Sequence, residues 1–437
     1  MSISLTIDVD KVIRLASFML MTAIMCTVPT SLAAKITTDF DETMTDVVTD
    51  SPSPDLSEAI TRAINTHPSV NAARLNAEAA GSDLKSAKWQ RFPSVSLETG
   101  VFEQDNYVPT TSAVLDLPLW TSGRIGSGID RAEYLQLSAE ASYHEAILEI
   151  SLAVNQSYHD VVRLNLRSAV LLNNVEEHRK MVLTMERRVA QEVSPQVDLD
   201  LARSRLSQVE QQFSLNKAQY DSALQRLREL LSDSVFLPKS QDYVNSWLNI
   251  DQESVIADGL AFSPRKAKLQ ADALAAGAEA KIIVASALPQ VSGQYSYNEL
   301  YGYRFGVVLK AQTDAGFSRF AATDAAKMRQ QSVEMQVNAT ESSLRDVLVN
   351  DHIEYVYASQ RIGNADGSAE SSRRVTESYM RQFISGRRGW LDVMNAVRES
   401  TTAGLDAIDA HINASSAYNR ILLRTGRWRP VISEATP

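Results

Sequence analysis

The feature that most constrains this chain is an internal repeat. Pro68 and Pro93 recur 196 residues later as Pro264 and Pro289, with no gap between them. A chain that contains two versions of one unit must build its fold from two similar halves. The predicted organisation is a first structural repeat at 55–231, a linker or equatorial segment at 232–250, and a second structural repeat at 251–424.

Each repeat is predicted to hold two helices, a strand pair and two much longer helices. Only 17 glycines and 13 prolines occur in 437 residues, whereas average usage is about 12% for the two together. A chain so poor in helix breakers favours long regular elements. In the first repeat the predicted helices are 56–65, 68–90, 123–192 and 195–231, and in the second they are 253–262, 264–286, 318–385 and 389–424.

The two strand pairs are predicted at 94–120 and 290–311. Pro93 and Pro289 mark where the preceding helices stop, because the residue before a proline disfavours the α region. Apolar residues then alternate with polar ones, as at 95–101 and 303–309. Period-2 alternation over about nine residues predicts strands, and that length also suits a tilted membrane strand.

The long helices carry a coiled-coil seam and defined ends. Ser194 and Pro195 are expected to start the return helix of the first repeat as its N-cap and first residue. Gly386 is expected to end the long helix of the second repeat. Apolar residues three and four positions apart predict a coiled-coil seam at Tyr143, Ile147, Ile150, Val154, Tyr158 and Val161.

The ends of the chain are predicted to lie outside the fold. Residues 1–34 have a basic start, the apolar run 15–28 and a small-residue cleavage site, which is typical of a secretory signal peptide. The single cysteine, Cys26, lies within it. Residues 35–54 are expected to be a flexible N-terminal segment, and 425–437 a C-terminal tail.

Composition and charge argue against several function classes. The net charge of −10 disfavours a nucleic-acid-binding surface. The six histidines and one cysteine show no metal-ligand spacing. We therefore expect no cofactor and no enzymatic activity. Two other classes stay open: a periplasmic adaptor, which would not repeat the strand pair, and a structural coiled coil, which would not need apolar alternating strands.

Four strands cannot cross a lipid bilayer alone, because an open sheet leaves its edge groups unpaired in lipid. Closure requires several chains. Three chains would supply twelve strands, and the two-fold repeat would give the trimer quasi-six-fold symmetry. The expected fold is mainly α with a β-barrel part: a trimeric outer-membrane barrel that continues into a long helical coiled-coil tunnel in the periplasm.

Over 55–428 the chain resembles the TolC family of outer-membrane efflux and secretion channels. The most specific stretch is 382–399, which is similar to the family signature F-x-x-G-x-x-x-x-L-D-V-L-x-A-x-R-E at the periplasmic helix turn. The resemblance implies a homotrimer in the outer membrane of a Gram-negative cell. It also implies a periplasmic adaptor and an inner-membrane ABC or RND transporter as partners.

The sequence of this turn is similar to that of the family branch that serves type I secretion. The expected function is therefore export of large proteins such as adhesins or RTX-like proteins. The alternative is a multidrug or small-molecule efflux channel.

The resemblance also suggests residues for a periplasmic gate. Asp392 would face the lumen in a ring of three carboxylates, and Asn395 stands where relatives carry a second aspartate. Arg388 and Asp198 match positions that latch the mobile helix pair to its neighbours. Phe383 stands where some relatives carry a tyrosine. The ordinary alternatives are an aspartate stabilised by the helix dipole and an exposed ion pair of about 0–1 kcal/mol.

Two further groups complete the expected site. Gly386 and Gly389 would make the second turn a flexible hinge, whereas Pro195 would stiffen the first turn. The chain would pass between the barrel and the helices at Pro93, Pro289, Pro118 and Trp120.

Overall fold

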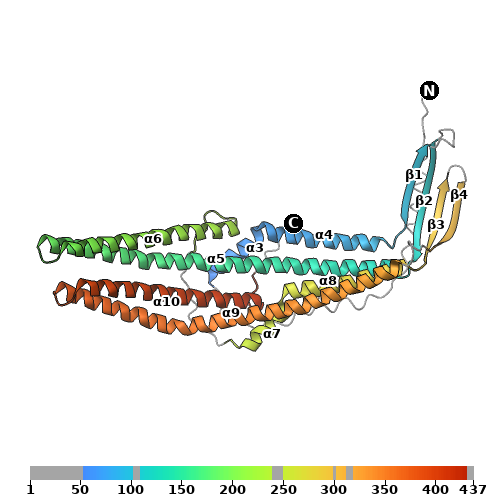
Figure 1. Ribbon diagram of the computed structural model, residues 1–437. Helices are drawn as coiled ribbons and strands as arrows, with labels where there is room; N and C mark the ends of the chain where they lie inside the picture. Colours follow the sequence, from blue (N-terminus) through green and yellow to red (C-terminus); the bar gives the residue numbers. More distant parts are fainter. Residues whose placement is uncertain (1–52, 102–108, 239–249, 299–301, 312–317, 431–437) are drawn as a thin grey trace, which may run out of the picture. The chain divides into compact units, whose positions relative to one another are not determined.

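The computed structural model describes residues 53–101, 109–238, 250–298, 302–311 and 318–430 (Figure 1). The predicted signal peptide, nearly all of the predicted N-terminal segment, residues 239–249 of the linker and residues 431–437 of the tail lie outside the described residues. In the part of the chain that is described, no helix is both long enough and apolar enough to span a membrane.

The described chain is mainly helical and contains the predicted order of elements twice. The first repeat comprises α3 (Pro54–Thr66), α4 (Pro68–Trp89), β1 (Ser94–Val101), β2 (Pro109–Trp120), α5 (Arg124–Ala190) and α6 (Gln196–Leu231). The second repeat comprises α7 (Gln252–Phe262), α8 (Pro264–Ser286), β3 (Gln290–Asn298), β4 (Gly302–Lys310), α9 (Ser318–Ile384) and α10 (Trp390–Arg424). The long helices α5 and α9 both have 67 residues.

Local chemistry explains most of the helix starts, with one correction. The Ser53 hydroxyl caps α3 by accepting from the Leu56 amide, and Ser263 caps α8 in the same way. The prediction that Ser194 caps α6 is wrong: Pro195 occupies the N-cap position and α6 starts at Gln196. The Ser194 hydroxyl instead accepts a 3.1 Å hydrogen bond from Nε of Arg188.

The four strands form one antiparallel sheet in the order β1-β2-β3-β4. Residues directly opposite one another share a face of the sheet. One face is apolar, with cross-strand rows Val95–Leu115–Tyr295–Phe305 and Leu97–Ala113–Tyr297–Tyr303. Leu97 and Phe305 are 74% and 82% exposed, so the described chain leaves this face largely uncovered.

The opposite face of the sheet is polar. Ser94, Asp116 and Gln294 form one of its rows. Oδ2 of Asp116 accepts a 3.1 Å hydrogen bond from the Ser292 hydroxyl and lies 3.3 Å from Nζ of Lys310. The sheet therefore separates an apolar side from a hydrogen-bonded, charged side, as the alternation predicts.

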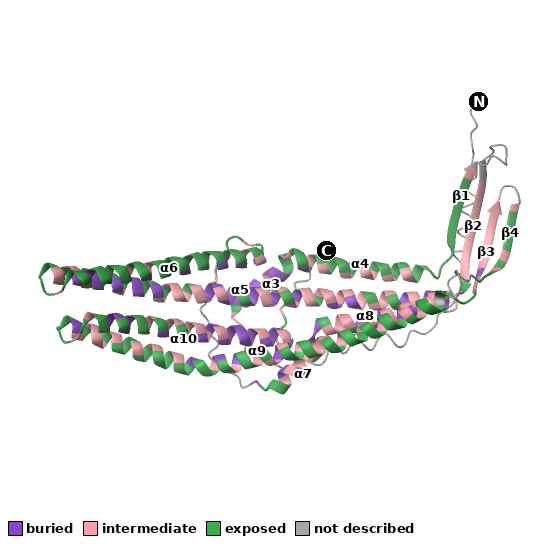
Figure 2. Ribbon diagram, viewed as in Figure 1, coloured by how far each residue is buried: buried purple, intermediate pink, exposed green. Residues whose placement is uncertain are grey.

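The helices bury a core that α5 organises. Helix α5 contacts α4, α6, α8 and α10, and α9 contacts α8 and α10 (Figure 1). The predicted coiled-coil seam is confirmed, since Ile147, Val154, Tyr158 and Val161 are buried in the main cluster. Buried positions follow α5 and α10, whereas exposed positions dominate α4 and α6 (Figure 2).

A second core joins α7, α9 and α10 around Leu348 and Tyr418. Asp351 of α9 lies beside it with a side chain that is only 10% exposed, and it pairs with Arg420 at 3.2 Å and Arg424 at 2.6 Å. A buried carboxylate with two cationic partners fixes the relative position of α9 and α10.

Candidate functional site

The turn between α9 and α10 is a Schellman motif centred on Gly386. Its φ of 73° lies in the left-handed region, which favours glycine. The Gly386 amide donates to the Phe383 carbonyl at 3.0 Å, and the Arg387 amide donates to the Gln382 carbonyl at 2.9 Å. The predicted glycine at the end of this helix is therefore confirmed.

The turn between α5 and α6 has the same hydrogen-bond pattern without a glycine. Glu192 occupies the position of Gly386 with a φ of 57°. Its amide donates to the Val189 carbonyl at 2.9 Å, and the Val193 amide donates to the Arg188 carbonyl at 2.8 Å. The two repeats therefore share their turn geometry, but only the second repeat has the residue that adopts it without strain.

Arg388 lies in the turn between α9 and α10 and contacts one residue of each helix. Its guanidinium carbon lies 3.9 Å from the Tyr379 ring centre, and its Nε lies 3.7 Å from Oδ2 of Asp392. Within the described chain this ion pair with Asp392, and not one with Asp198, is what Arg388 forms. The expected latch to Asp198 therefore remains a prediction about a trimer.

Asp392 and Asn395 lie on the exposed side of α10. Asp392 is in the first turn of the helix, with a side chain that is 52% exposed. Asn395 follows three residues later and is also exposed. Both positions could face a lumen, and the position of Asp392 equally suits stabilisation by the helix dipole. The predicted ring of carboxylates would need the neighbouring subunits.

Helices α5 and α6 form one helical hairpin, and α9 and α10 form a second. Near their turns the two hairpins meet in one apolar cluster, here called the tip cluster. Phe383 is 6% exposed within it, so this expected gate residue packs in a core. The tip cluster consists of Met181, Val182 and Met185 of α5, Leu199 and Ala202 of α6, Phe383 of α9, and Val393, Met394 and Val397 of α10.

Arg188, which no sequence pattern singles out, lies beside the tip cluster. Its guanidinium carbon lies 5.2 Å from the centre of the Phe383 ring. Apolar spacing along α5 could have pointed to the methionines of the cluster. A contact between residues so distant in sequence leaves no comparable local signal.

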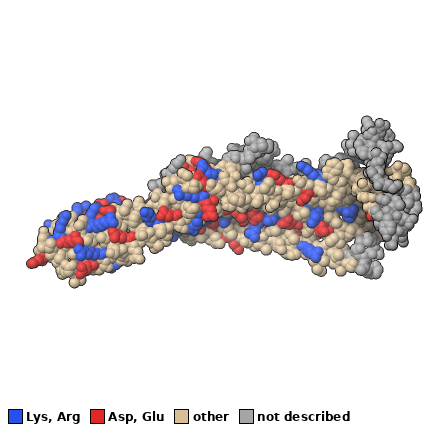
Figure 3. All heavy atoms as spheres, turned by 90° about the horizontal axis from the view of Figure 1, so that it is seen from above, with Lys and Arg blue, Asp and Glu red and all other residues tan. Residues whose placement is uncertain are grey.

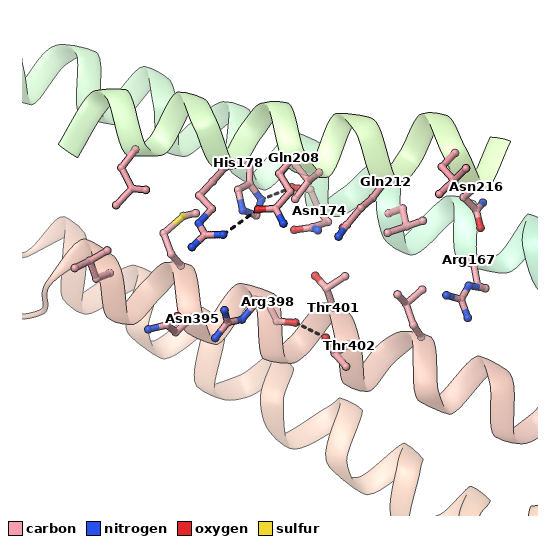
Figure 4. A pocket seen from close by; sticks show the side chains of 18 of the residues that line it. Arg167, Asn174, His178, Gln208, Gln212, Asn216, Asn395, Arg398, Thr401 and Thr402 are labelled. Carbon is pink, nitrogen blue, oxygen red and sulfur yellow. Dashed lines mark hydrogen bonds between the residues drawn. The ribbon is translucent and has the colours of Figure 1, made fainter. Parts of the chain in front are cut away.

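A groove next to the tip cluster is lined by residues of α5, α6 and α10 (Figure 4). We call it the hairpin groove. Its volume is about 570 Å³. Arg167, Arg205 and Arg398 line it, and the described lining contains no carboxylate. Asn174 and His178 of α5 line it too, and the Oδ1 of Asn174 is buried without a described hydrogen-bond partner.

Two buried histidines have structural roles. Nδ1 of His159 donates to the Asn155 carbonyl, and Nδ1 of His178 donates to the Asn174 carbonyl, both at 2.8 Å. Burial lowers the pKa of His159 to about 4 and also lowers the pKa of His178. Among the described residues, no three His, Cys, Asp or Glu side chains are placed to hold a metal ion.

The residues expected at the barrel junction lie at the strand ends. Pro93 and Pro289 directly precede β1 and β3. Pro118 pairs with Ser292 and Trp120 pairs with Val291, so β2 has an irregular register just before it ends.

Among the described surface residues, basic and acidic side chains are interspersed on the face shown in Figure 3.

Residues 59–232 match the family model described as outer membrane efflux protein. No curated protein sequence matches the chain.

Several solved structures share the fold, among them the following three. A membrane protein from Pseudomonas aeruginosa has a TM-score of 0.75 and 17% identity, covering 85% of this chain and 92% of that one. The CmeC outer membrane channel of Campylobacter jejuni has a TM-score of 0.73 and 14% identity, covering 92% and 90%. The open-state MtrE outer membrane channel of Neisseria gonorrhoeae has a TM-score of 0.70 and 16% identity, covering 85% and 89%.

These comparisons agree with the expected mainly helical fold with four strands per chain. They give no support for the type I secretion branch over other branches. The first repeat therefore resembles the outer membrane efflux protein family in sequence, and the chain shares the fold of the CmeC and MtrE outer membrane channels.

Proposed function

We propose that this protein is the outer-membrane exit duct of an efflux assembly and acts as a homotrimer. The observation that carries the proposal is the four-stranded sheet, which has one apolar face, one polar face and two open edges at β1 and β4 in the described chain. Three copies would pair these edges and close a barrel of twelve strands. The apolar face would then meet lipid, and the polar face would line a lumen.

The cargo class that we propose is small molecules. The description of the family model that matches the first repeat names efflux. The solved structures with this fold include outer membrane channels from two bacteria. Type I protein secretion is the second candidate. It is supported by the turn sequence 382–399, whose resemblance to the secretion branch is described above.

The partners that we propose are a periplasmic adaptor and an inner-membrane transporter of the ABC or RND type. The hairpin groove offers the adaptor a cationic surface with apolar contacts, since Arg205 and Arg398 lie beside Leu201, Leu391 and Leu405. A helix that carries carboxylates between apolar residues would complement such a groove. The proposed adaptor segment is therefore an acidic amphipathic helix.

A charge reversal tests the groove as the adaptor site. Arg398→Glu should weaken copurification of the adaptor by about tenfold, because it places a carboxylate against an acidic partner. The control Arg374→Glu changes an exposed arginine of α9 outside the described lining and should leave copurification unchanged. Equal binding by both variants and the parent would exclude this groove.

Two measurements test the proposed function itself. The purified trimer should form discrete channels in planar lipid bilayers, and a strain that lacks the gene should lose tolerance to small toxic compounds. Protein secretion should be unchanged in that strain. Loss of a large secreted protein with unchanged tolerance would favour type I secretion, and a purified trimer without conductance would contradict a duct of either kind.

A further inference from the structure

We propose that the end of α4 binds the phosphate headgroups of anionic phospholipids through three basic side chains, here called the junction cluster: Lys85, Lys88 and Arg91. The junction cluster comes directly before Pro93 and β1, where the chain passes from helix to sheet. The inference rests on the proposed function, because that function places this end of the sheet at the periplasmic surface of the outer membrane.

The junction cluster is exposed and has no counter-ion among the described residues. Lys85, Lys88 and Arg91 are all exposed, and none of them pairs with a described carboxylate. Asp83 is the acidic residue nearest in sequence, but side chains two positions apart on a helix do not face each other. The end of α4 therefore carries a local positive charge on a chain whose net charge is −10.

The turn that follows α4 removes an obstacle to anion binding and adds two aromatic rings. The last carbonyls of a helix carry partial negative charge, but here the amides of residues 90–92 donate to the carbonyls of residues 87–89 at 2.9–3.4 Å. The rings of Trp89 and Phe92 lie 4.9 Å apart and are 67% and 50% exposed. Exposed aromatic rings beside cations are typical of the boundary between headgroups and hydrocarbon.

The second repeat indicates which of these positions stay accessible when another helix packs beside them. Helix α4 contacts α3 and α5, whereas its counterpart α8 contacts both α5 and α9. The counterparts of the junction cluster, Lys281, Val284 and Ala287, remain exposed beside α9, but Ala285, the counterpart of Trp89, is 4% exposed. If α9 of a neighbouring subunit packs on α4 in the same way, Trp89 becomes covered and the junction cluster stays exposed.

The charge of the junction cluster is a property of the first repeat alone. Val284 and Ala287 stand where the first repeat has Lys88 and Arg91, so the fold does not require basic side chains at this place. Leu288 is 48% exposed on the same turn, and an exposed apolar side chain suits a lipid boundary better than a water-filled lumen. A trimer would therefore carry three junction clusters, one for each subunit.

A phospholipid suits this place in both of its parts. Arg91 precedes Val95 by four residues, at most about 14 Å of chain, and Val95 and Leu97 are 72% and 74% exposed on the apolar face of the sheet. Acyl chains on that face would hold a phosphate within reach of the long basic side chains. Lysine and arginine are attracted to an anionic membrane surface, whereas a free phosphate ion would make no use of the apolar face.

The thermal stability of the purified trimer in a non-ionic detergent tests the junction cluster. Phosphatidylglycerol should raise the temperature at which the heat-modifiable trimer band dissociates, and phosphatidylcholine should raise it less. The test variant removes the three charges together by Lys85→Gln, Lys88→Gln and Arg91→Gln. It should need about tenfold more phosphatidylglycerol for half of the temperature shift, because three cations near the headgroup are lost.

A matched control removes three other exposed cations, from α5 and α6, by Arg187→Gln, Lys217→Gln and Arg226→Gln. Its net charge changes equally, and it should respond to phosphatidylglycerol like the parent. Inorganic phosphate at the same concentration should not replace the lipid, because it lacks acyl chains.

The outcomes separate this inference from the proposed function. Equal phosphatidylglycerol dependence in the parent and the test variant, or equal stabilisation by inorganic phosphate, would overturn the lipid site. A conducting channel without preference for phosphatidylglycerol would overturn the lipid site and leave the duct intact. A trimer that prefers phosphatidylglycerol through the junction cluster but forms no channel in bilayers would contradict the proposed function and leave the lipid site standing.

Discussion

At the scale of single residues, the two helix turns differ in one backbone position. Gly386 has a left-handed φ of 73° and its missing side chain would meet no atom within 4 Å. Gly386→Ala should therefore lower the free energy of unfolding by about 1 kcal/mol through backbone strain alone. The control Gly363→Ala lies in the interior of α9, where alanine should raise it by about 0.5–1 kcal/mol. Chemical denaturation of both variants, followed by circular dichroism, checks the opposite signs, and equal signs would contradict the turn assignment.

His159 should make the folded protein less stable in acid. Burial lowers its pKa to about 4 in the folded chain, against the ordinary value of 6.5, while Asp160, Arg163 and Arg420 are the charged groups near it. Between pH 6.5 and 4 the unfolded chain binds the additional proton. The free energy of unfolding should therefore decrease as the pH is lowered through this range, by up to about 3 kcal/mol for each subunit.

The pH dependence of denaturant unfolding checks this prediction. Replacement of His159 by glutamine should flatten the slope between pH 6.5 and 4, whereas His67→Gln, at the start of α4, should leave it unchanged. An unaltered slope in His159→Gln would show that another group causes the acid sensitivity.

At the scale of elements, the pairing of α9 with α10 depends on a buried carboxylate. Asp351 is 10% exposed and pairs with both Arg420 and Arg424, whereas Glu354 is 50% exposed and pairs with Arg420 at 2.6 Å. Asp351→Ala should destabilise the protein by about 3 kcal/mol, because it leaves two arginines without this partner. Glu354→Ala should cost about 0–1 kcal/mol. Similar losses in a denaturation experiment would show that burial does not control the strength of these pairs.

The elements themselves could be predicted from sequence because their signals are local. Alternation over nine residues predicts β4, and prolines and Gly386 give the ends of the helices. Helix α6 starts one residue later than the sequence predicts, because the Ser194 hydroxyl bonds to Arg188 instead of capping the helix. Contacts between distant elements, such as Arg188 on Phe383 and Asp351 on Arg424, have no local pattern that would reveal them.

At the scale of the whole molecule, a trimer would bring three Asp392 side chains around one axis. Their carboxylates should attract divalent cations, so Asp392→Ala should weaken block by such cations added from the periplasmic side by about tenfold. Asp200→Ala removes an exposed carboxylate of α6 near the other turn and should leave block unchanged. Conductance measured against cation concentration checks both, and unchanged block in Asp392→Ala would exclude the ring.

The central claim is that the sheet forms part of a membrane barrel, with its apolar face toward lipid and its polar face toward a lumen. The single cysteine, Cys26, lies in the predicted signal peptide, so single cysteines can be placed along the strands. In outer-membrane preparations, a water-soluble maleimide should label Ser96→Cys and Gly306→Cys and should leave Leu97→Cys and Phe305→Cys largely unlabelled, because lipid excludes the reagent. Equal labelling on both faces would contradict the barrel and the duct that depends on it.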